Sequence, residues 1–387
     1  MQAILPIDSI RFPLTGIGRY TYELARHLPD ALPGLDLKLM AAGRFVNNIP
    51  TESVASNPDQ SRALKVQVRR WLQNHSVLAA TAKRAWLDHR EKQSLRGHED
   101  AVFHGTQFYL PRFAGPCVVT IHDLSVYSWA HCHPPGRVRT MRKGIENSVK
   151  QASVILADSE FTRQELIDYF SLRPEKVRAV PLASADYFCP RTVDELSTVL
   201  PRLGLQAGGY SLFSGSIEPR KNLEVLLKAY GMLPDSLRKK YPLVLCGYQG
   251  WRNTDVLARI DKAEKEGWAR YIGYVSSQDL PYVFAGARLF AFPSLYEGFG
   301  LPVLEAMASG VPVACSNSSS LPEVAGNAAL MCAPEDVDHF AELLQQGLED
   351  EAWRESAREQ GLQQNARFSW ARCASETGAV YKTALYA

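Results

Sequence analysis

Short runs of apolar, often β-branched residues alternate along the chain with longer amphipathic stretches. The runs predict buried strands at residues 3–7, 35–41, 101–105, 117–123, 153–159, 177–183, 210–215, 242–247, 287–293 and 311–316. Apolar positions at helical spacing separate many of them, for example at residues 18–28, 161–169, 222–233 and 337–348. Strands that are apolar throughout and alternate with helices are typical of parallel sheets covered by helices on both faces. The pattern therefore predicts an α/β fold.

The alternation breaks between residues 184 and 209, where two prolines and a glycine pair interrupt it. The chain has 387 residues, and a domain usually holds about 100–200. We therefore expect two doubly wound, Rossmann-like parallel-sheet domains that face each other across a cleft. The expected boundaries are a first domain at 1–185, a linker at 186–208, a second domain at 209–370 and a C-terminal helix at 371–387. Because doubly wound sheets bind ligands at the carboxyl ends of their strands, we expect the ligand in that cleft.

The charge balance changes this picture little, except in one segment. Lys and Arg number 43 against 41 Asp and Glu, and a net charge of +2 argues against a nucleic-acid binder. Residues 62–96, however, are strongly basic and carry Trp71 and Trp86 at amphipathic spacing. They favour a solvated helical excursion, with peripheral contact to an anionic membrane surface as the alternative.

The seven cysteines include no CxxC pair, and several stand in apolar runs, which indicates reduced buried thiols. The N-terminus does not resemble a secretory signal, and no apolar run approaches about 20 residues, so we expect a cytoplasmic protein. Metal binding is disfavoured at Cys132 and its two flanking histidines, because three adjacent side chains cannot easily face one ion. Asp336 and Asp338 begin a predicted helix, where acids are favoured in any case. We expect no metal and no cofactor.

The most informative segment is residues 293–313, which follows a predicted buried strand. Pro302 suits the first turn of a helix and Gly310 its left-handed end. The preceding loop lies where backbone N–H groups favour a phosphate, and its glycines allow a ligand to approach closely. Glu297 and Glu305 can both accept hydrogen bonds from sugar or ribose hydroxyls. The alternative is an ordinary strand–turn–helix with two solvated glutamates.

Residues 215–223 also follow a strand and open a helix. Arg220 and Lys221 near that helix start oppose its dipole, so they are poorly placed for stability alone. They fit an anion such as a diphosphate leaving group, on which developing negative charge needs compensation. A solvated surface pair is the alternative.

In the first half, His122 and Asp123 stand at the end of an apolar strand. This histidine fits a role on a sugar hydroxyl or a departing phosphate, with a structural His–Asp pair as the alternative. Residues 15–20 form a glycine loop before a helix. Thr21 stands where a dinucleotide fingerprint needs its third glycine, so this loop alone indicates an ordinary turn.

With these residues in view, the chain resembles glycosyltransferase family 4, of the GT-B fold, nearly from end to end. The segments that carry the resemblance are TGIGRYTYELARHL, TIHDL, ADSEFTRQELIDYF, KVRAVPLA, GSIEPRKNLEVLLKAY, LVLCG, YIGYVSSQDLPYVFAGA, FPSLYEGFGLPVLEAMASGVPV and SSLPEVAGNAAL. Two positions depart from the usual pattern: Ser216, where many members have a basic residue, and Ala183, where glycine is usual.

The resemblance implies retaining, metal-independent transfer, with acceptor binding by the first domain and nucleotide-sugar binding by the second. It implies that His122, Glu297, Arg220 and Lys221 serve catalysis, with Glu297 beside the donor sugar and the two cations on the diphosphate. It implies donor contacts for a further set of residues: Gly16, Gly18, Gly273, Tyr274, Val275, Phe299, Gly300, Leu301 and Glu305. It also implies that the C-terminal helix crosses back to the first domain.

The combination of IHDLS, EPRKNL and SNSSSLPEV resembles the bacterial polysaccharide mannosyltransferases. This favours GDP-mannose, or a deoxy relative such as a GDP-rhamnose, as donor. It favours a lipid-linked or lipopolysaccharide glycan such as O-antigen as acceptor, at the inner membrane face. The alternatives are a UDP-sugar donor, a hydrolase, phosphorylase or epimerase on the same frame, and a non-catalytic GT-B binding or scaffold protein. The incomplete glycine motif disfavours a NAD-dependent dehydrogenase.

Overall fold

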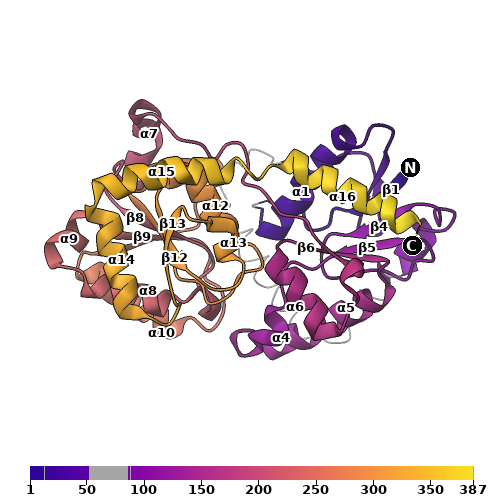
Figure 1. The fold of residues 1–387 in the computed structure, drawn as a ribbon, viewed down its shortest axis with the longest axis horizontal. Coiled ribbons are helices and arrows are strands. Elements are labelled where there is room, and N and C mark those ends of the chain that lie inside the picture. The colour runs from indigo at the N-terminus through magenta and orange to yellow at the C-terminus, as the bar shows by residue number, and fades with distance from the viewer. Residues whose placement is uncertain (13, 52–85, 88, 387) are drawn as a thin grey trace, which may run out of the picture. The chain divides into compact units, whose positions relative to one another are not determined.

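The computed structural model describes the chain except residues 13, 52–85, 88 and 387 (Figure 1). Most of the basic segment 62–96 lies outside the described residues, and with it both the favoured solvated helical excursion and the alternative of peripheral membrane contact. The chain forms two compact units. One comprises Met1–Thr120, Gly144–Ile155 and Ala374–Ala387, and the other comprises Ile121–Lys143 and Leu156–Cys373. Among the described helices, none has the length and apolar character that a membrane crossing requires.

The first sheet has seven strands in the order β3-β2-β1-β4-β5-β6-β7. Their bounds are β1 Gln2–Pro6, β2 Asp36–Ala41, β3 Arg44–Val46, β4 Val102–Gly105, β5 Cys117–Thr120, β6 Val154–Ala157 and β7 Val177–Ala179. β1 pairs in parallel with β2 and β4, and β4 with β5, whereas β3 is antiparallel to β2. Every residue of β4, β5 and β6 is buried, as expected for central strands of a covered parallel sheet.

The second sheet has six parallel strands in the order β10-β9-β8-β11-β12-β13. Their bounds are β8 Ser211–Ser214, β9 Leu243–Cys246, β10 Ala269–Gly273, β11 Leu289–Phe292, β12 Val313–Ser316 and β13 Ala329–Cys332. The order runs outward from β8 to one edge and then from β11 to the other, which is the doubly wound Rossmann arrangement. Both sheets therefore confirm the predicted fold class.

Helices fill the connections between the strands. Their bounds are α1 Gly16–Ala31, α4 Ser125–Ser128, α5 Pro135–Gln151, α6 Glu160–Phe170, α7 Val193–Val199, α8 Leu223–Met232, α9 Asp235–Lys240, α10 Thr254–Lys265, α11 Leu280–Ala285, α12 Leu301–Ala308, α13 Leu321–Ala325, α14 Val337–Glu349, α15 Glu351–Asn365 and α16 Trp370–Leu385. Short 3-10 turns lie at Ala130–Cys132, Pro174–Lys176, Leu200–Leu203 and Pro219–Lys221. In the second sheet, α14 packs on α8 and on strands β11 to β13.

Side-chain caps and glycines set several helix boundaries. Thr15 caps α1 by accepting a hydrogen bond from Gly18 N at 3.2 Å, so Gly16 and Gly18 lie in the first helical turn rather than in a loop before it. Asp336 caps α14 by accepting from His339 N at 3.0 Å. The acids at 336 and 338 thus begin a helix, as predicted. Gly300, at φ 110°, precedes α12 and admits a backbone conformation that other residues avoid.

The structure adds elements that the pattern did not predict. The strands β3, β10 and β13 are all edge strands, and most of their residues are at least partly exposed. The expected linker at 186–208 contains α7, whose N-terminus has a capping box formed by Thr192 and Glu195. In α16, the residues from Ala374 onward belong to the unit that contains β1.

Candidate active site

The candidate site lies where the strand order of the second sheet reverses, between β8 and β11. The carboxyl ends of these neighbouring parallel strands lie at one edge of the sheet, which is the usual ligand position in doubly wound folds. The chain leaving β8 carries Arg220 and Lys221. The chain leaving β11 carries residues 293–300, here called the Glu297 loop. Backbone hydrogen bonding from Leu295 N to Arg220 O, at 2.9 Å, joins the two segments directly.

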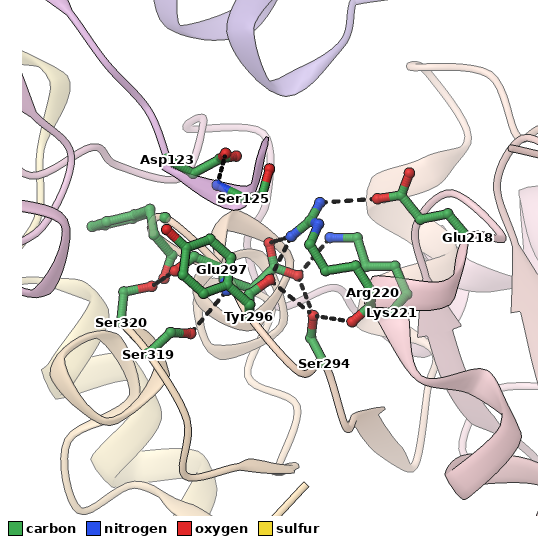
Figure 2. Close-up of polar contacts among 12 residues, drawn as sticks. Asp123, Ser125, Glu218, Arg220, Lys221, Ser294, Tyr296, Glu297, Ser319 and Ser320 are labelled. Carbon is green, nitrogen blue, oxygen red and sulfur yellow. Dashed lines mark hydrogen bonds and ion pairs between the residues drawn. The ribbon is translucent and has the colours of Figure 1, made fainter. Parts of the chain in front are cut away.

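Glu297 binds both cations (Figure 2). Its Oε1 accepts hydrogen bonds from Lys221 Nζ at 2.6 Å and from Ser294 Oγ at 2.6 Å. Its Oε2 accepts from Arg220 Nη1 at 3.0 Å. Arg220 also donates from Nη2 to Glu218 Oε1 at 2.9 Å. Glu218, Arg220, Lys221 and Glu297 form a compact set, here called the ion cluster, and all but Arg220 are buried by residue exposure.

The electrostatics of the ion cluster favour an ionised Glu297. Burial alone would raise the pKa of this carboxyl, but the charges of Arg220 and Lys221 and their hydrogen bonds lower it to about 2. The pKa of Arg220 is raised, because Glu297, Asp123 and Glu218 together outweigh its burial. Two cations and two carboxylates therefore face one another in a space with little water, where each interaction is stronger than at a surface.

The backbone around the cluster is fixed by side-chain amide and hydroxyl groups. Asn222, at φ 56°, directs its Nδ2 to Pro293 O at 3.0 Å and to Pro334 O at 2.7 Å. Ser320 Oγ lies within hydrogen-bonding distance of Glu297 O and Phe299 O, at 2.9 and 2.7 Å. Ser319 Oγ accepts from Glu297 N at 2.8 Å. A network of short polar contacts thus holds the Glu297 loop in one conformation.

His122 lies beside the same loop. A Cβ built on Gly298 would lie 1.8 Å from His122 O, so the two backbones are in direct contact. Ser159 Oγ donates to Gly298 O at 2.7 Å, and the imidazole Nδ1 of His122 lies 2.7 Å from Asp158 Oδ2. His122, Arg220, Lys221 and Glu297, all predicted from sequence, therefore stand on adjoining segments of one compact unit.

The other predicted residues lie on two further parts of the second sheet. Gly300 is the N-cap of α12, Leu301 is its first residue, and Glu305 is buried in its second turn. Phe299 is buried against Phe368, with ring centroids 5.7 Å apart. Gly273, Tyr274 and Val275 end or follow β10, at the same edge of the sheet. Gly16 and Gly18 belong to the other unit, where a Cβ on Gly18 would lie 2.8 Å from Ser9 O.

Sequence reasoning missed one aromatic residue at this edge. Tyr248 follows β9, and its ring stacks on Tyr274 with centroids 4.7 Å apart and planes 17° from parallel. Both rings are about half exposed, at 51% and 44%. Ile217 N donates to Tyr248 O at 2.9 Å, three positions before Arg220. Tyr248 comes shortly after the buried strand β9, and this position in the sequence could have marked it as a candidate binding residue.

This arrangement suits an extended anionic ligand. The ion cluster provides two fixed cations, and α12 directs its N-terminal amides into the same edge of the sheet. Glu305 is an acceptor for hydroxyl groups, and the stacked tyrosines offer a flat aromatic surface. Among the described residues, no group of three or more His, Cys, Asp or Glu is placed to hold a metal ion.

Comparison with known proteins shows which families the chain is similar to. The family described as "Glycosyltransferase Family 4" matches residues 14–183, and the family described as "Glycosyl transferases group 1" matches residues 206–364. Over 382 residues, the chain is 41% identical to the O-antigen chain mannosyltransferase B of Escherichia coli, covering 99% of this chain and 100% of that one.

Solved structures show the same fold at low sequence identity. HepE of Anabaena, solved with UDP-glucose, is 15% identical with a TM-score of 0.72, covering 99% of this chain and 100% of that one. WaaG, a glycosyltransferase involved in lipopolysaccharide biosynthesis, is 15% identical with a TM-score of 0.69, covering 98% and 99%. The fold and the comparisons together define a GT-B glycosyltransferase. The chain belongs to glycosyltransferase family 4, so the resemblance drawn from its motifs is confirmed.

Proposed function

We propose that the protein moves a hexose, mannose or a deoxy relative such as rhamnose, from a nucleotide diphosphate sugar to a polysaccharide or lipid-linked glycan such as O-antigen. The support is the full-length similarity to an O-antigen chain mannosyltransferase of Escherichia coli. The acceptor would be met at the cytoplasmic face of the inner membrane. Residues 62–96 remain the candidate for peripheral membrane contact.

The observation that carries the proposal is the ion cluster at the strand edge. Arg220 and Lys221 are held within 3.0 Å of Glu297, so their charges are positioned before any ligand binds. A diphosphate that departs from the sugar develops negative charge, and preorganised cations lower the energy of that state. The amides at the start of α12 add to this effect.

The reaction we propose proceeds with retention of configuration. The bond from the sugar C1 to the phosphate oxygen breaks, and its electron pair leaves with the diphosphate. The acceptor hydroxyl attacks C1 on the face that the diphosphate leaves, and its proton passes to the departing phosphate oxygen. Glu297 lies beside the sugar, Glu305 binds ribose hydroxyls, and His122 contacts the reacting sugar. No metal or cofactor takes part in this scheme.

The stacked rings of Tyr248 and Tyr274 support a position for the nucleotide base. Base–aromatic stacking contributes about 1–3 kcal/mol per base. With the diphosphate on Arg220 and Lys221, the backbone of Gly273 to Val275 and this ring pair lie on the side of β8 away from β11. We favour a GDP-sugar, with a UDP-sugar as the alternative.

A combined binding and transfer experiment tests the proposal. Thermal shifts with GDP, UDP, ADP and their common sugars identify the nucleotide, because a ligand that binds only the folded state raises Tm. Incubation with the identified donor and a mannose-containing oligosaccharide primer, with product analysis by mass spectrometry and NMR, then tests transfer and retention.

We expect transfer to persist in excess chelator. Donor turnover without acceptor would indicate a hydrolase instead. Binding without any turnover across the acceptor panel would favour the non-catalytic alternative. An inverted product, or activity restored to a chelated enzyme by a divalent ion, would contradict the proposed mechanism.

A further inference from the structure

His122 and Asp158 follow neighbouring strands and meet at their carboxyl ends. Ile121 N donates to Leu156 O at 2.9 Å, which sets the register of the two segments. Two positions beyond Leu156, the Asp158 carboxylate then lies opposite the His122 ring, with Oδ2 at 2.7 Å from Nδ1. This contact is between side chains whose exposures are 15% for His122 and 4% for Asp158.

Burial of the Asp158 carboxylate in its charged form is energetically unfavourable. It is buried, and burial raises its pKa even though the nearby His122 acts in the opposite direction. Its second oxygen, Oδ1, has no hydrogen-bond partner among the described residues. A buried acceptor left without a partner destabilises the folded state, and does so more strongly when it is charged. A carboxylate that served only to pack this corner would be expected to satisfy both oxygens.

The residue after Asp158 fixes the same turn to the Glu297 loop. Ser159 Oγ donates to Gly298 O at 2.7 Å, and Thr162 Oγ1 lies 3.1 Å from the same carbonyl oxygen. Glu323 accepts from Glu160 N at 2.9 Å, at the start of α6. These contacts fix the position of Asp158 relative to the Glu297 loop. They thereby also fix the position of the His122 imidazole, which Asp158 contacts.

We propose that Asp158 is a positioning residue for His122, an inference that rests on the proposed glycosyl transfer. The carboxylate accepts a hydrogen bond from Nδ1–H, which fixes the neutral imidazole in the tautomer whose Nε2 is the acceptor. Nε2 then accepts a hydrogen bond from a hydroxyl of the donor sugar and holds the sugar for attack. Asp158 itself touches neither the donor nor the acceptor.

The tautomer can be measured without any assay of transfer. In protein labelled with nitrogen-15 at histidine, long-range proton–nitrogen spectra distinguish Nδ1–H from Nε2–H, and the His122→Gln variant identifies the His122 signals. We expect Nδ1–H in the wild type and a shift toward Nε2–H in Asp158→Ala. The Asp158→Asn variant, which keeps size and removes charge, should lie between them.

The kinetic consequence is a larger change in kcat than in donor binding. Partners that orient metal-binding histidines are commonly worth about 10–100-fold in activity, and by analogy we expect kcat to fall by a similar factor in Asp158→Ala and by less in Asp158→Asn. The KM for the donor should rise by a smaller factor than kcat falls, because one sugar contact weakens while the diphosphate contacts are untouched. Asp168→Asn is the matched control, because Asp168 lies exposed on α6, where its Oδ1 accepts a hydrogen bond from Gln164 Nε2 at 2.9 Å.

The outcomes separate this inference from the proposed function. A wild-type His122 protonated on Nε2, or an Asp158→Ala variant with unchanged tautomer and kcat, would overturn the role of Asp158. If Asp158→Ala does not fold, the wild-type spectrum and the Asp158→Asn variant still show whether Asp158 sets the tautomer of His122. A wild type that binds donor but transfers nothing would overturn the proposed function, while the spectra would still report whether Asp158 sets the tautomer.

Discussion

Gly298 lies so close to His122 that a Cβ built on it would stand 1.8 Å from the His122 carbonyl oxygen. A real Cβ cannot occupy that position, and the obstructing atom belongs to the backbone. This contact, which only glycine permits, joins the Glu297 loop to the segment that carries the candidate catalytic histidine. It makes the relative placement of Glu297 and His122 sensitive to a single methyl group.

We therefore expect Gly298→Ala to lower kcat/KM by about 100-fold, since a displacement of roughly 1 Å in a reacting group can cost that much. The free energy of unfolding should fall by about 1–3 kcal/mol, as for other overpacked sites. Steady-state kinetics and urea denaturation measure the two effects. Gly231→Ala on α8 is the control, because nothing lies within 4 Å of its added Cβ. Equal activity in the two variants would contradict the role of the Gly298–His122 contact in placing Glu297 relative to His122.

The buried pair of Lys221 and Glu297 should behave unlike a surface pair of the same residue types. We expect Lys221→Met to reduce the free energy of unfolding by about 3–5 kcal/mol, because it leaves a buried carboxylate with one cation fewer. Adding Glu297→Gln should recover part of that loss. Neither variant should retain transfer activity.

The exposed pair of Lys228 and Glu224, 3.0 Å apart, provides the matched control. Lys228→Met should change the free energy of unfolding by at most about 1 kcal/mol. If the two lysine variants were equally stable by urea denaturation, the ion cluster would not have the energetic weight that its burial implies.

Acid should remove the stabilisation that Glu297 provides. Its pKa is about 2 in the folded protein, below the ordinary 4.5, because the two cations outweigh the effect of burial. A carboxyl with a lowered folded pKa stabilises the fold above its unfolded pKa, and this contribution is lost as pH falls toward the folded pKa. The stability difference between wild type and Glu297→Gln should thus be constant near neutral pH and shrink between about pH 4.5 and pH 2. Urea denaturation at fixed pH values tests this, and a difference that stayed constant to pH 3 would refute it.

Loss of either stacked tyrosine should weaken nucleotide binding. We expect Tyr248→Ala and Tyr274→Ala each to raise the Kd of the nucleotide by about 5–150-fold, the equivalent of 1–3 kcal/mol. Calorimetric titration measures the change. Tyr169→Ala, which removes another exposed ring at 54% exposure on α6, should leave the Kd unaltered. A similar loss in all three variants would argue against a base at the ring pair.

The sequence predicted the central strands and the edge strand β7, but missed the edge strands β3, β10 and β13. A run such as Leu243–Cys246 is apolar throughout because both of its faces are covered. In β10 the exposed Arg270 interrupts the apolar run, whereas Ala329–Cys332 is apolar throughout, so β13 was missed although its signal is present.

The sequence identified several residues of the candidate site, but it did not predict which of them contact one another. Arg220, Lys221 and Glu297 stood out because each follows a strand and precedes a helix. Their meeting depends on β8 lying next to β11, a strand order that local pattern does not contain. Asp158 and the serines at 319 and 320 were missed for a similar reason. Their hydrogen-bond partners are distant in sequence and come close only in the folded protein. In the sequence they look like ordinary turn residues, because short polar residues are common in turns.

The ion cluster contains two cations and two carboxylates, and this equality has a consequence for how a ligand arrives. Glu218 and Glu297 compensate the charges of Arg220 and Lys221 at short range. The cluster therefore exerts little electrostatic attraction on an anionic ligand that is still in solution. Long-range steering needs an uncompensated field. The ion cluster should therefore add little to the dependence of the association rate on ionic strength, and it discriminates between ligands only at contact distance.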